Sequence, residues 1–191
     1  MTSSSATHQP TIVQIEADVL AWLKDIVIGH NLCPFASREL RLNRVRLHVS
    51  AATQPQDLVD ALQAELERLV ANKEIETALL IHPWVLQDFA QYNQFLDIAD
   101  ALLAMMSLEG VIQIASFHPN YQFEGSDDDD PANYTNRSPY PLLHLLREDS
   151  VAKAVEQYGD SSMIPKRNVE HLEALGIDEV RAMTARCKAR S

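Results

Sequence analysis

The amino-acid sequence predicts an α/β fold. We expect a single domain with a short parallel or mixed sheet built from a βαβαβ unit, flanking helices and a C-terminal helical pair. Short apolar runs alternate with longer helical patterns through the middle of the chain, which is typical of consecutive βαβ units. The 191 residues contain no segment with a linker composition, and this length suits one domain with its own core. We therefore expect a disordered tail at residues 1–10 and one α/β domain at residues 11–191.

Hydrophobic periodicity predicts the first elements. Apolar residues recur at helical spacing from Ile15 to Val27, and Gly29 is a natural end for this helix. Residues 44–50 alternate between apolar and polar side chains, as in a strand with one side facing solvent. Residues 57–72 carry leucine along one helical face, which predicts a second amphipathic helix.

The later elements complete the pattern. Residues 77–81 and 110–117 are apolar runs that predict strands, and residues 88–106 between them carry an apolar stripe that predicts a helix. A long polar stretch follows. We expect a helix over about residues 142–158 and then a closing helical pair with its turn at Gly176.

Charge and composition restrict the class of partner. The chain has 16 Lys and Arg against 27 Asp and Glu, a net charge of -11, which argues against nucleic acid or anionic membrane as the main partner. Its two cysteines, Cys33 and Cys187, are far apart and offer no disulfide framework, so a cytoplasmic location is the simplest expectation. The first ten residues lack the features of a signal peptide, and no apolar run approaches the ~20 residues of a membrane span. The sequence is also compatible with a homo-oligomer.

Two predicted strands end in the same dipeptide, His82-Pro83 and His118-Pro119. Proline cannot continue a strand, so each histidine is expected at the carboxyl rim of the sheet, where α/β proteins usually place their chemistry. If the two strands are neighbours, their ends lie roughly 5 Å apart. His82, His118 and Asp128 are therefore candidate ligands for a transition metal such as zinc or iron. Alternatively, each histidine packs at its strand end and bonds a backbone carbonyl.

The polar stretch at residues 120–141 is too long for a simple connection. Its acidic run, Asp127 to Asp130, either binds a hard cation or is only solvated. Arg137 has the planar fork that grips carboxylate or phosphate, and it precedes what looks like a helix start that could hold an anion. Alternatively, Arg137 ties the loop to Asp or to carbonyl groups. The candidate substrate-binding residues are Tyr121, Asn133, Arg137 and Ser138.

Cys33 precedes Pro34 in a segment that suggests a helix start. With Pro34 at the first helical position, Cys33 would be the N-cap, where the helix dipole favours a thiolate that serves as nucleophile, redox thiol or metal ligand. The alternative is a small core residue. His144 stands among leucines and is expected in the core or at its edge, although it is near enough to the loop to be a third ligand. The candidate catalytic residues are Cys33, His118 and Asn136.

Four segments of the chain resemble a known family. They are Leu32-Cys-Pro-Phe-Ala36, residues 88–95, Ser116-Phe-His-Pro-Asn-Tyr-Gln-Phe123, and residues 133–141 running into residues 143–148. Together they resemble the DUF1415 family, a bacterial domain of unknown function. The resemblance covers nearly the whole chain after the tail and implies a small, stand-alone bacterial protein. It implies no activity, cofactor or catalytic residue.

The leading functional hypothesis is a small cytoplasmic enzyme that acts on a small anionic metabolite. Its His, Asn and Arg side chains would line a site at the carboxyl rim of the sheet, with a thiolate or a metal as the reactive element. The alternative is a non-catalytic accessory protein that carries a metal or haem, or that docks a partner through residues 120–141.

Overall fold

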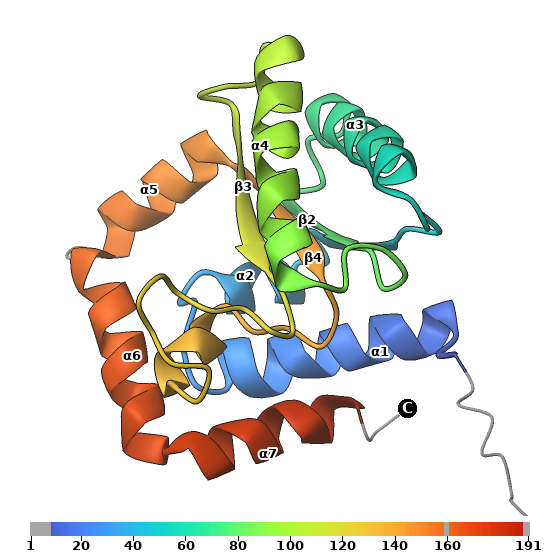
Figure 1. Ribbon diagram of the computed structural model, residues 1–191. Coiled ribbons are helices and arrows are strands. Elements are labelled where there is room, and N and C mark those ends of the chain that lie inside the picture. The colour runs from blue at the N-terminus through green and yellow to red at the C-terminus, as the bar shows by residue number, and fades with distance from the viewer. Residues whose placement is uncertain (1–8, 159–160, 189–191) are drawn as a thin grey trace, which may run out of the picture.

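The computed structural model describes residues 9–158 and 161–188, so most of the predicted tail lies outside the described residues. Within these ranges, four strands form one mixed sheet in the order β1-β2-β4-β3, with helices around it (Figure 1). The predicted α/β class, the mixed sheet and the C-terminal helical pair are confirmed. The strands are β1 (Val45–Val49), β2 (Thr77–Ile81), β3 (Ile112–Phe117) and β4 (Leu142–Arg147).

The sheet topology sets the position of the strand ends. β1 and β2 are parallel, and β4 is antiparallel to both β2 and β3. The strands β1, β2 and β3 therefore run in one direction, and their carboxyl ends meet at one rim. The condition that β2 and β3 be neighbours is not met, because β4 lies between them.

The strand β4 corrects a second expectation. Residues 142–147 were predicted to begin a helix, but they form a strand, and α5 (Glu148–Tyr158) starts only after it. Leu143 and Leu145 enter one core while Leu142 enters the other. A strand buried on both faces gives a continuous apolar run, and such a run also fits a buried helix. His144 lies in this strand, with its Nε2 2.7 Å from the hydroxyl oxygen of Thr77.

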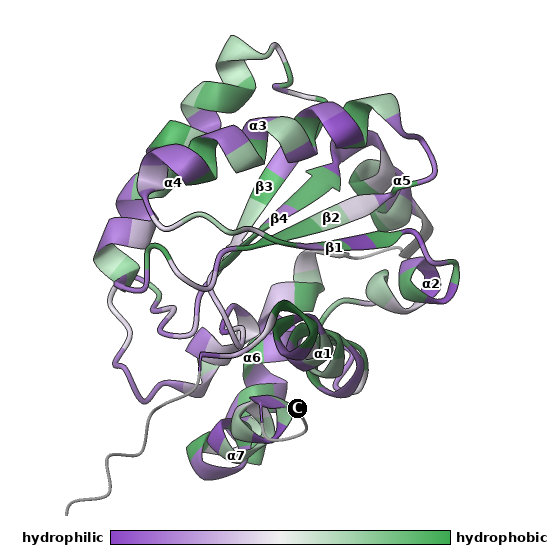
Figure 2. Ribbon diagram, turned by 90° about the vertical axis from the view of Figure 1, so that its right-hand side faces the viewer, coloured by the Kyte–Doolittle hydropathy of each residue, from purple (hydrophilic) through white to green (hydrophobic). Residues whose placement is uncertain are grey.

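Helices cover both faces of the sheet (Figure 2). Helices α3 and α4 pack on one face, against Leu80 and its neighbours, and α1 and α7 lie on the other side with Leu79. Every helix in the described part of the chain is too short or too polar to cross a membrane. The helices are α1 (Ile12–Trp22), α2 (Ala36–Arg41), α3 (Pro55–Ala71), α4 (Phe89–Met105), α5, α6 (Ile164–Leu175) and α7 (Ile177–Lys188).

Two glycines end helices as the sequence predicts. Helix α1 continues through a π-helical segment, η1 (Leu23–Ile28), to Gly29. A Cβ atom at Gly29 would collide with the carbonyl oxygen of Asp25, so this helix end requires glycine. Gly176 has a φ of 80° and separates α6 from α7, and this region of φ favours a residue without a Cβ atom.

Candidate functional site

The rim histidines lie on either side of the amino end of β4. In the sheet register, Ile81 pairs with Leu142 and Leu142 pairs with Phe117, and His82 and His118 follow these two strands directly. Tyr92 of α4 fills the space between the rings, with its centroid 5.7 Å from that of His82 and 5.1 Å from that of His118. The Tyr92 hydroxyl donates to the Leu142 carbonyl at 2.9 Å and accepts from the Phe117 N–H at 3.0 Å. One tyrosine thus ties together two strand ends of the rim.

The two rim histidines differ in their hydrogen bonds. The Leu86 carbonyl can only accept, so His118 donates to it from Nε2 at 3.2 Å, and its Nδ1 accepts from the Asn120 N–H at 3.0 Å. His82 donates from Nδ1 to the Val85 carbonyl at 3.1 Å, whereas its buried Nε2 has no partner among the described residues. Burial lowers the pKa of both rings, that of His82 to about 4. Both rings are therefore uncharged at neutral pH, and His118 matches the alternative of a histidine bonded to a carbonyl.

The predicted metal ligands are not brought together. Asp128 forms an ion pair with Arg137 at 2.7 Å, and its side chain is 77% exposed. In His118 both ring nitrogens bond the main chain, so neither offers a free lone pair. Across residues 9–158 and 161–188, no group of three His, Cys, Asp or Glu side chains is placed to hold a metal ion.

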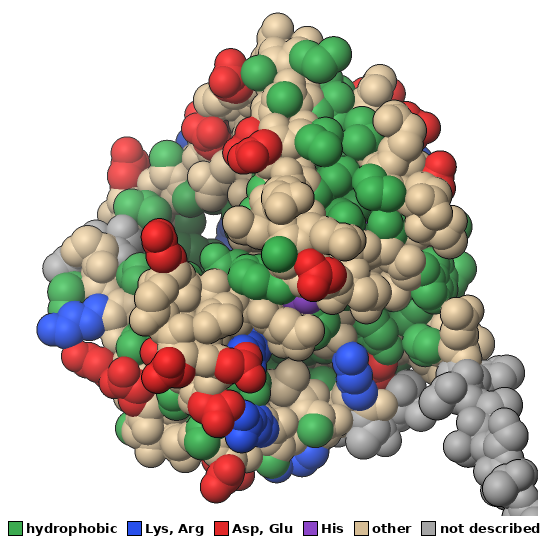
Figure 3. Space-filling model, in the orientation of Figure 1, with side chains coloured by type: hydrophobic (Ala, Val, Ile, Leu, Met, Phe, Trp, Pro, Cys, Tyr) green, Lys and Arg blue, Asp and Glu red, His purple; other side chains and the backbone are tan. Residues whose placement is uncertain are grey.

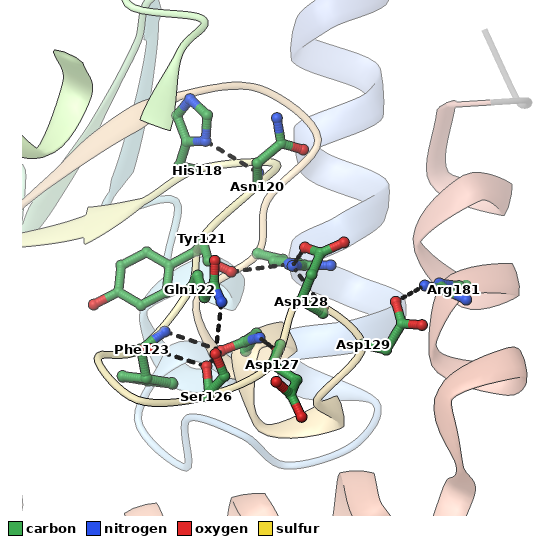
Figure 4. Close-up of polar contacts among 12 residues, drawn as sticks. His118, Asn120, Tyr121, Gln122, Phe123, Ser126, Asp127, Asp128, Asp129 and Arg181 are labelled. Carbon is green, nitrogen blue, oxygen red and sulfur yellow. Dashed lines mark hydrogen bonds and ion pairs between the residues drawn. The ribbon is translucent and has the colours of Figure 1, made fainter. Parts of the chain in front are cut away.

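Arg137 ties the polar loop together. It is 7% exposed and donates from Nε to the Tyr121 carbonyl at 3.0 Å. Its Nη2 donates to the carbonyl and the carboxylate of Asp128, at 3.0 and 2.7 Å, and its guanidinium lies 4.6 Å from the centroid of the Tyr134 ring. Figure 4 shows this arrangement around Tyr121 and Asp128. These contacts match the structural interpretation of Arg137. The helix start expected after it is wrong, because β4 follows.

Asn133 organises the same loop from within. It is fully buried, and its side-chain oxygen accepts from the Phe123 N–H at 3.0 Å and from the Ser126 hydroxyl at 2.8 Å. Its amide nitrogen donates to the Asp127 carbonyl at 2.8 Å, and the partners of Asn133 are labelled in Figure 4. Because both its oxygen and its nitrogen are engaged in hydrogen bonds, the Asn133 side chain stabilises the loop and has little hydrogen-bonding capacity left for a ligand.

Asn136 and Ser138 also bond the main chain. The Asn136 amide donates to the Ser116 carbonyl at 3.0 Å, where it covers part of the open edge of β3. The Ser138 hydroxyl donates to the Tyr140 carbonyl at 2.6 Å. Both side chains hold the loop in place, and Ser138 in addition borders a cavity.

Cys33 is not the N-cap of a helix. Helix α2 begins at Ala36 with Phe35 as its N-cap. The Ala36 N–H bonds the Cys33 carbonyl at 3.3 Å, so Pro34 is the second residue of a β-turn, a position that its fixed φ suits as well as a helix start. The expectation of a cysteine at a helix N-terminus is therefore wrong, although the residue is partly exposed.

A cavity of about 180 Å³ lies beside the rim, between the polar loop and α7. Arg181 stands at its α7 wall, where it forms an ion pair with Asp129 of the loop (Figure 4). A hydrogen bond to the Tyr134 hydroxyl and the charge of Asp129 raise the pKa of Arg181, which keeps its full positive charge. The described residues that line the cavity are Pro119, Tyr134, Ser138, Pro139, Arg181, Thr184, Ala185 and Lys188.

Lys188 supplies a second cation to this cavity. Its Nζ lies 4.7 Å from the centroid of the Tyr140 ring. The Tyr140 hydroxyl donates at 2.7 Å to Asp18, a carboxylate that is 2% exposed. Burial lowers the pKa of Lys188, while the negative charge of Asp18 raises it. Asp18 and Tyr140 thus hold the ammonium group at this end of α7.

Arg181 and Lys188 are not predicted as site residues from the sequence. Both belong to a short amphipathic helix with many charges, and such charges are usually solvated. The signal that could have found them is their spacing, because Arg181, Thr184, Ala185 and Lys188 recur at the interval that places residues on one helical face.

A comparison with protein families supports the resemblance seen in the sequence. The model of a family described as a protein of unknown function (DUF1415) matches residues 14–182. The chain belongs to the DUF1415 family. The DUF1415 match runs from α1 into α7, so it includes both rim histidines, the polar loop and Arg181. Searches of curated proteins and of solved structures found no match.

Proposed function

We propose that this DUF1415 protein binds a small anionic molecule in the cavity between the polar loop and α7. The observation that carries the proposal is the pair of cations, Arg181 and Lys188, among the described lining residues of a chain whose net charge is -11. Acidic side chains surround this region, with a few basic ones between them (Figure 3). The field of such a protein repels anions, so local cations are needed to hold one.

Two hydroxyl groups of the cavity already donate to main-chain carbonyls. Thr184 donates its hydrogen to the Val180 carbonyl at 3.1 Å, and Ser138 donates to the Tyr140 carbonyl. An anion in the cavity would therefore meet its charged donors at Arg181 and Lys188. Charge-assisted hydrogen bonds of this kind are roughly twice as strong as neutral ones.

This proposal changes the residue to which the enzyme hypothesis assigns anion binding. The anion-binding role passes from Arg137, which is consumed by the loop, to Arg181 at the cavity wall. Lys188 is the second cation of this lining, and the negative charge of Asp18 opposes the effect of burial on its pKa. An enzymatic role requires that anion binding be found first.

Titration with inorganic phosphate, followed residue by residue by NMR, tests the proposal. We expect saturable shifts that gather at Tyr134 and along α7, and a loss of about tenfold in affinity in Arg181→Gln. The matched control is Arg186→Gln, because Arg186 is also an exposed α7 arginine in an ion pair, with Glu179 at 2.8 Å, but it does not line this cavity. Shifts that do not saturate, or an equal response of both variants, would contradict anion binding here.

A further inference from the structure

We infer that the cavity prefers an elongated molecule with an anionic group at each end, such as a linear dicarboxylate. This inference rests on the proposed function and names the class of ligand. Arg181 and Lys188 are seven residues apart in one helix, which separates their Cα atoms by about 10 Å along the axis. Thr184 and Ala185 lie between them on the same face.

The two cations are anchored in different places. Arg181 is held toward the loop by its ion pair with Asp129. Lys188 lies over the ring of Tyr140 and is drawn by the buried Asp18 behind that ring. Because the two cations have different partners, we expect a single small ion to pair with one of them at a time. A molecule with two anionic ends can contact both while they keep their positions.

The space between the two cations is suited to a hydrocarbon segment. Ala185 lies between Arg181 and Lys188 on α7, and Pro119 and Pro139 add apolar surface to the cavity lining. The volume of about 180 Å³ is below the roughly 300–1,000 Å³ of pockets for drug-sized ligands. The cavity therefore fits a short metabolite better than a nucleotide or a peptide.

Calorimetric titration with two matched series tests this inference at constant ionic strength and neutral pH. One series is the linear dicarboxylates from malonate to adipate, and the other is the monocarboxylates of the same chain lengths. We expect the best dicarboxylate to bind at least about tenfold more tightly than its monocarboxylate. We also expect an optimum at an intermediate length, because the two cations are at a fixed separation.

Charge-removing variants assign the two ends. Arg181→Gln and Lys188→Gln should each reduce the dicarboxylate to the affinity of the monocarboxylate, while Arg186→Gln and Lys166→Gln leave the advantage intact. Lys166 is a suitable control because it is an exposed α6 lysine paired with Glu170 at 3.7 Å, away from the cavity lining. The ratio of dicarboxylate affinity to monocarboxylate affinity in the parent protein decides the question even if a variant folds poorly.

Three outcomes would overturn the inference in distinguishable ways. If phosphate and monocarboxylates bind through Arg181 but dicarboxylates gain less than about twofold, the cavity binds single anions and the proposed function stands. If the dicarboxylate advantage survives in Lys188→Gln, the second end is not at Lys188. If no anion binds the parent protein, the proposed function fails together with the inference.

Discussion

Arg137 and Arg181 show how differently one residue type behaves in two regions of this molecule. Both pair with the acidic run of the polar loop, Arg137 with Asp128 and Arg181 with Asp129. Arg137 is 7% exposed and bonds two main-chain carbonyls in addition, whereas the Arg181 side chain is 45% exposed and faces a cavity. Burial and fixed main-chain partners make the first arginine part of the fold. Exposure beside a cavity leaves the second available to a ligand.

The contrast between a buried side chain and an exposed one also separates the buried histidines from the residues of the cavity. The lowered pKa of His82 and of His144, about 4 in each case, lies below the ordinary 6.5 of an unfolded histidine. Between these values the unfolded chain binds protons that the folded chain does not, so the free energy of unfolding falls as the pH falls. Below about 4 these two groups cause no further loss.

Acidification is therefore expected to have the largest effect on the buried region. Each histidine contributes a loss of roughly 1.4 kcal/mol per pH unit within this window. Denaturant unfolding at pH 7, 6 and 5 measures the slope. His82→Asn keeps the donor to the Val85 carbonyl but removes the titrating group, so its slope should be shallower by about one such increment. An unchanged slope would show that His82 does not stay neutral in the folded protein.

Replacing Arg137 by Lys is the next largest change. The substitution keeps the charge but removes the fork that serves Tyr121 and Asp128 together. With a buried carbonyl left unpaired, we expect a loss of about 2 kcal/mol in the free energy of unfolding, which lowers Tm by about 4–8 °C in a domain of this size. Phosphate affinity should be nearly unchanged when measured well below the new Tm. A variant that melts like the parent but loses anion binding would return the binding role to Arg137.

The sequence predicts those parts of the structure that depend on neighbouring residues. Helices α3 and α4 follow from local periodicity, and the histidines are placed at strand ends because proline follows each one. Residues 142–147 are not recognisable as a strand, because a strand buried on both faces has no alternation and its burial depends on helices distant in the chain. The turn at Pro34 is not recognisable either, because proline favours the second position of a turn as much as a helix start.

The candidate site is harder to predict because it depends on contacts across the chain. The sequence shows that Arg137 belongs to a polar loop, but the Tyr121 carbonyl to which it donates is 16 residues away. Arg181 meets Asp129 across 52 residues, and only the folded chain shows that a cavity opens beside that pair. Residue type therefore identifies the chemistry that is available, and tertiary contacts decide which residue of that type is available to a ligand.

The smallest expected effect is a gain. Asp129 forms an ion pair with Arg181, the cation that a ligand would contact. Asp129→Asn should therefore release Arg181 and tighten phosphate binding by about twofold to fivefold, in keeping with the modest energy of an exposed ion pair. The matched control is Asp127→Asn, which removes the same charge from the same acidic run but leaves the ion pair of Arg181 intact. Both variants reduce the general repulsion of anions equally, so the difference between them isolates the competition at Arg181. If the two variants bind phosphate equally, Asp129 does not compete with the ligand, and Arg181 would join Arg137 as a structural tie of the loop.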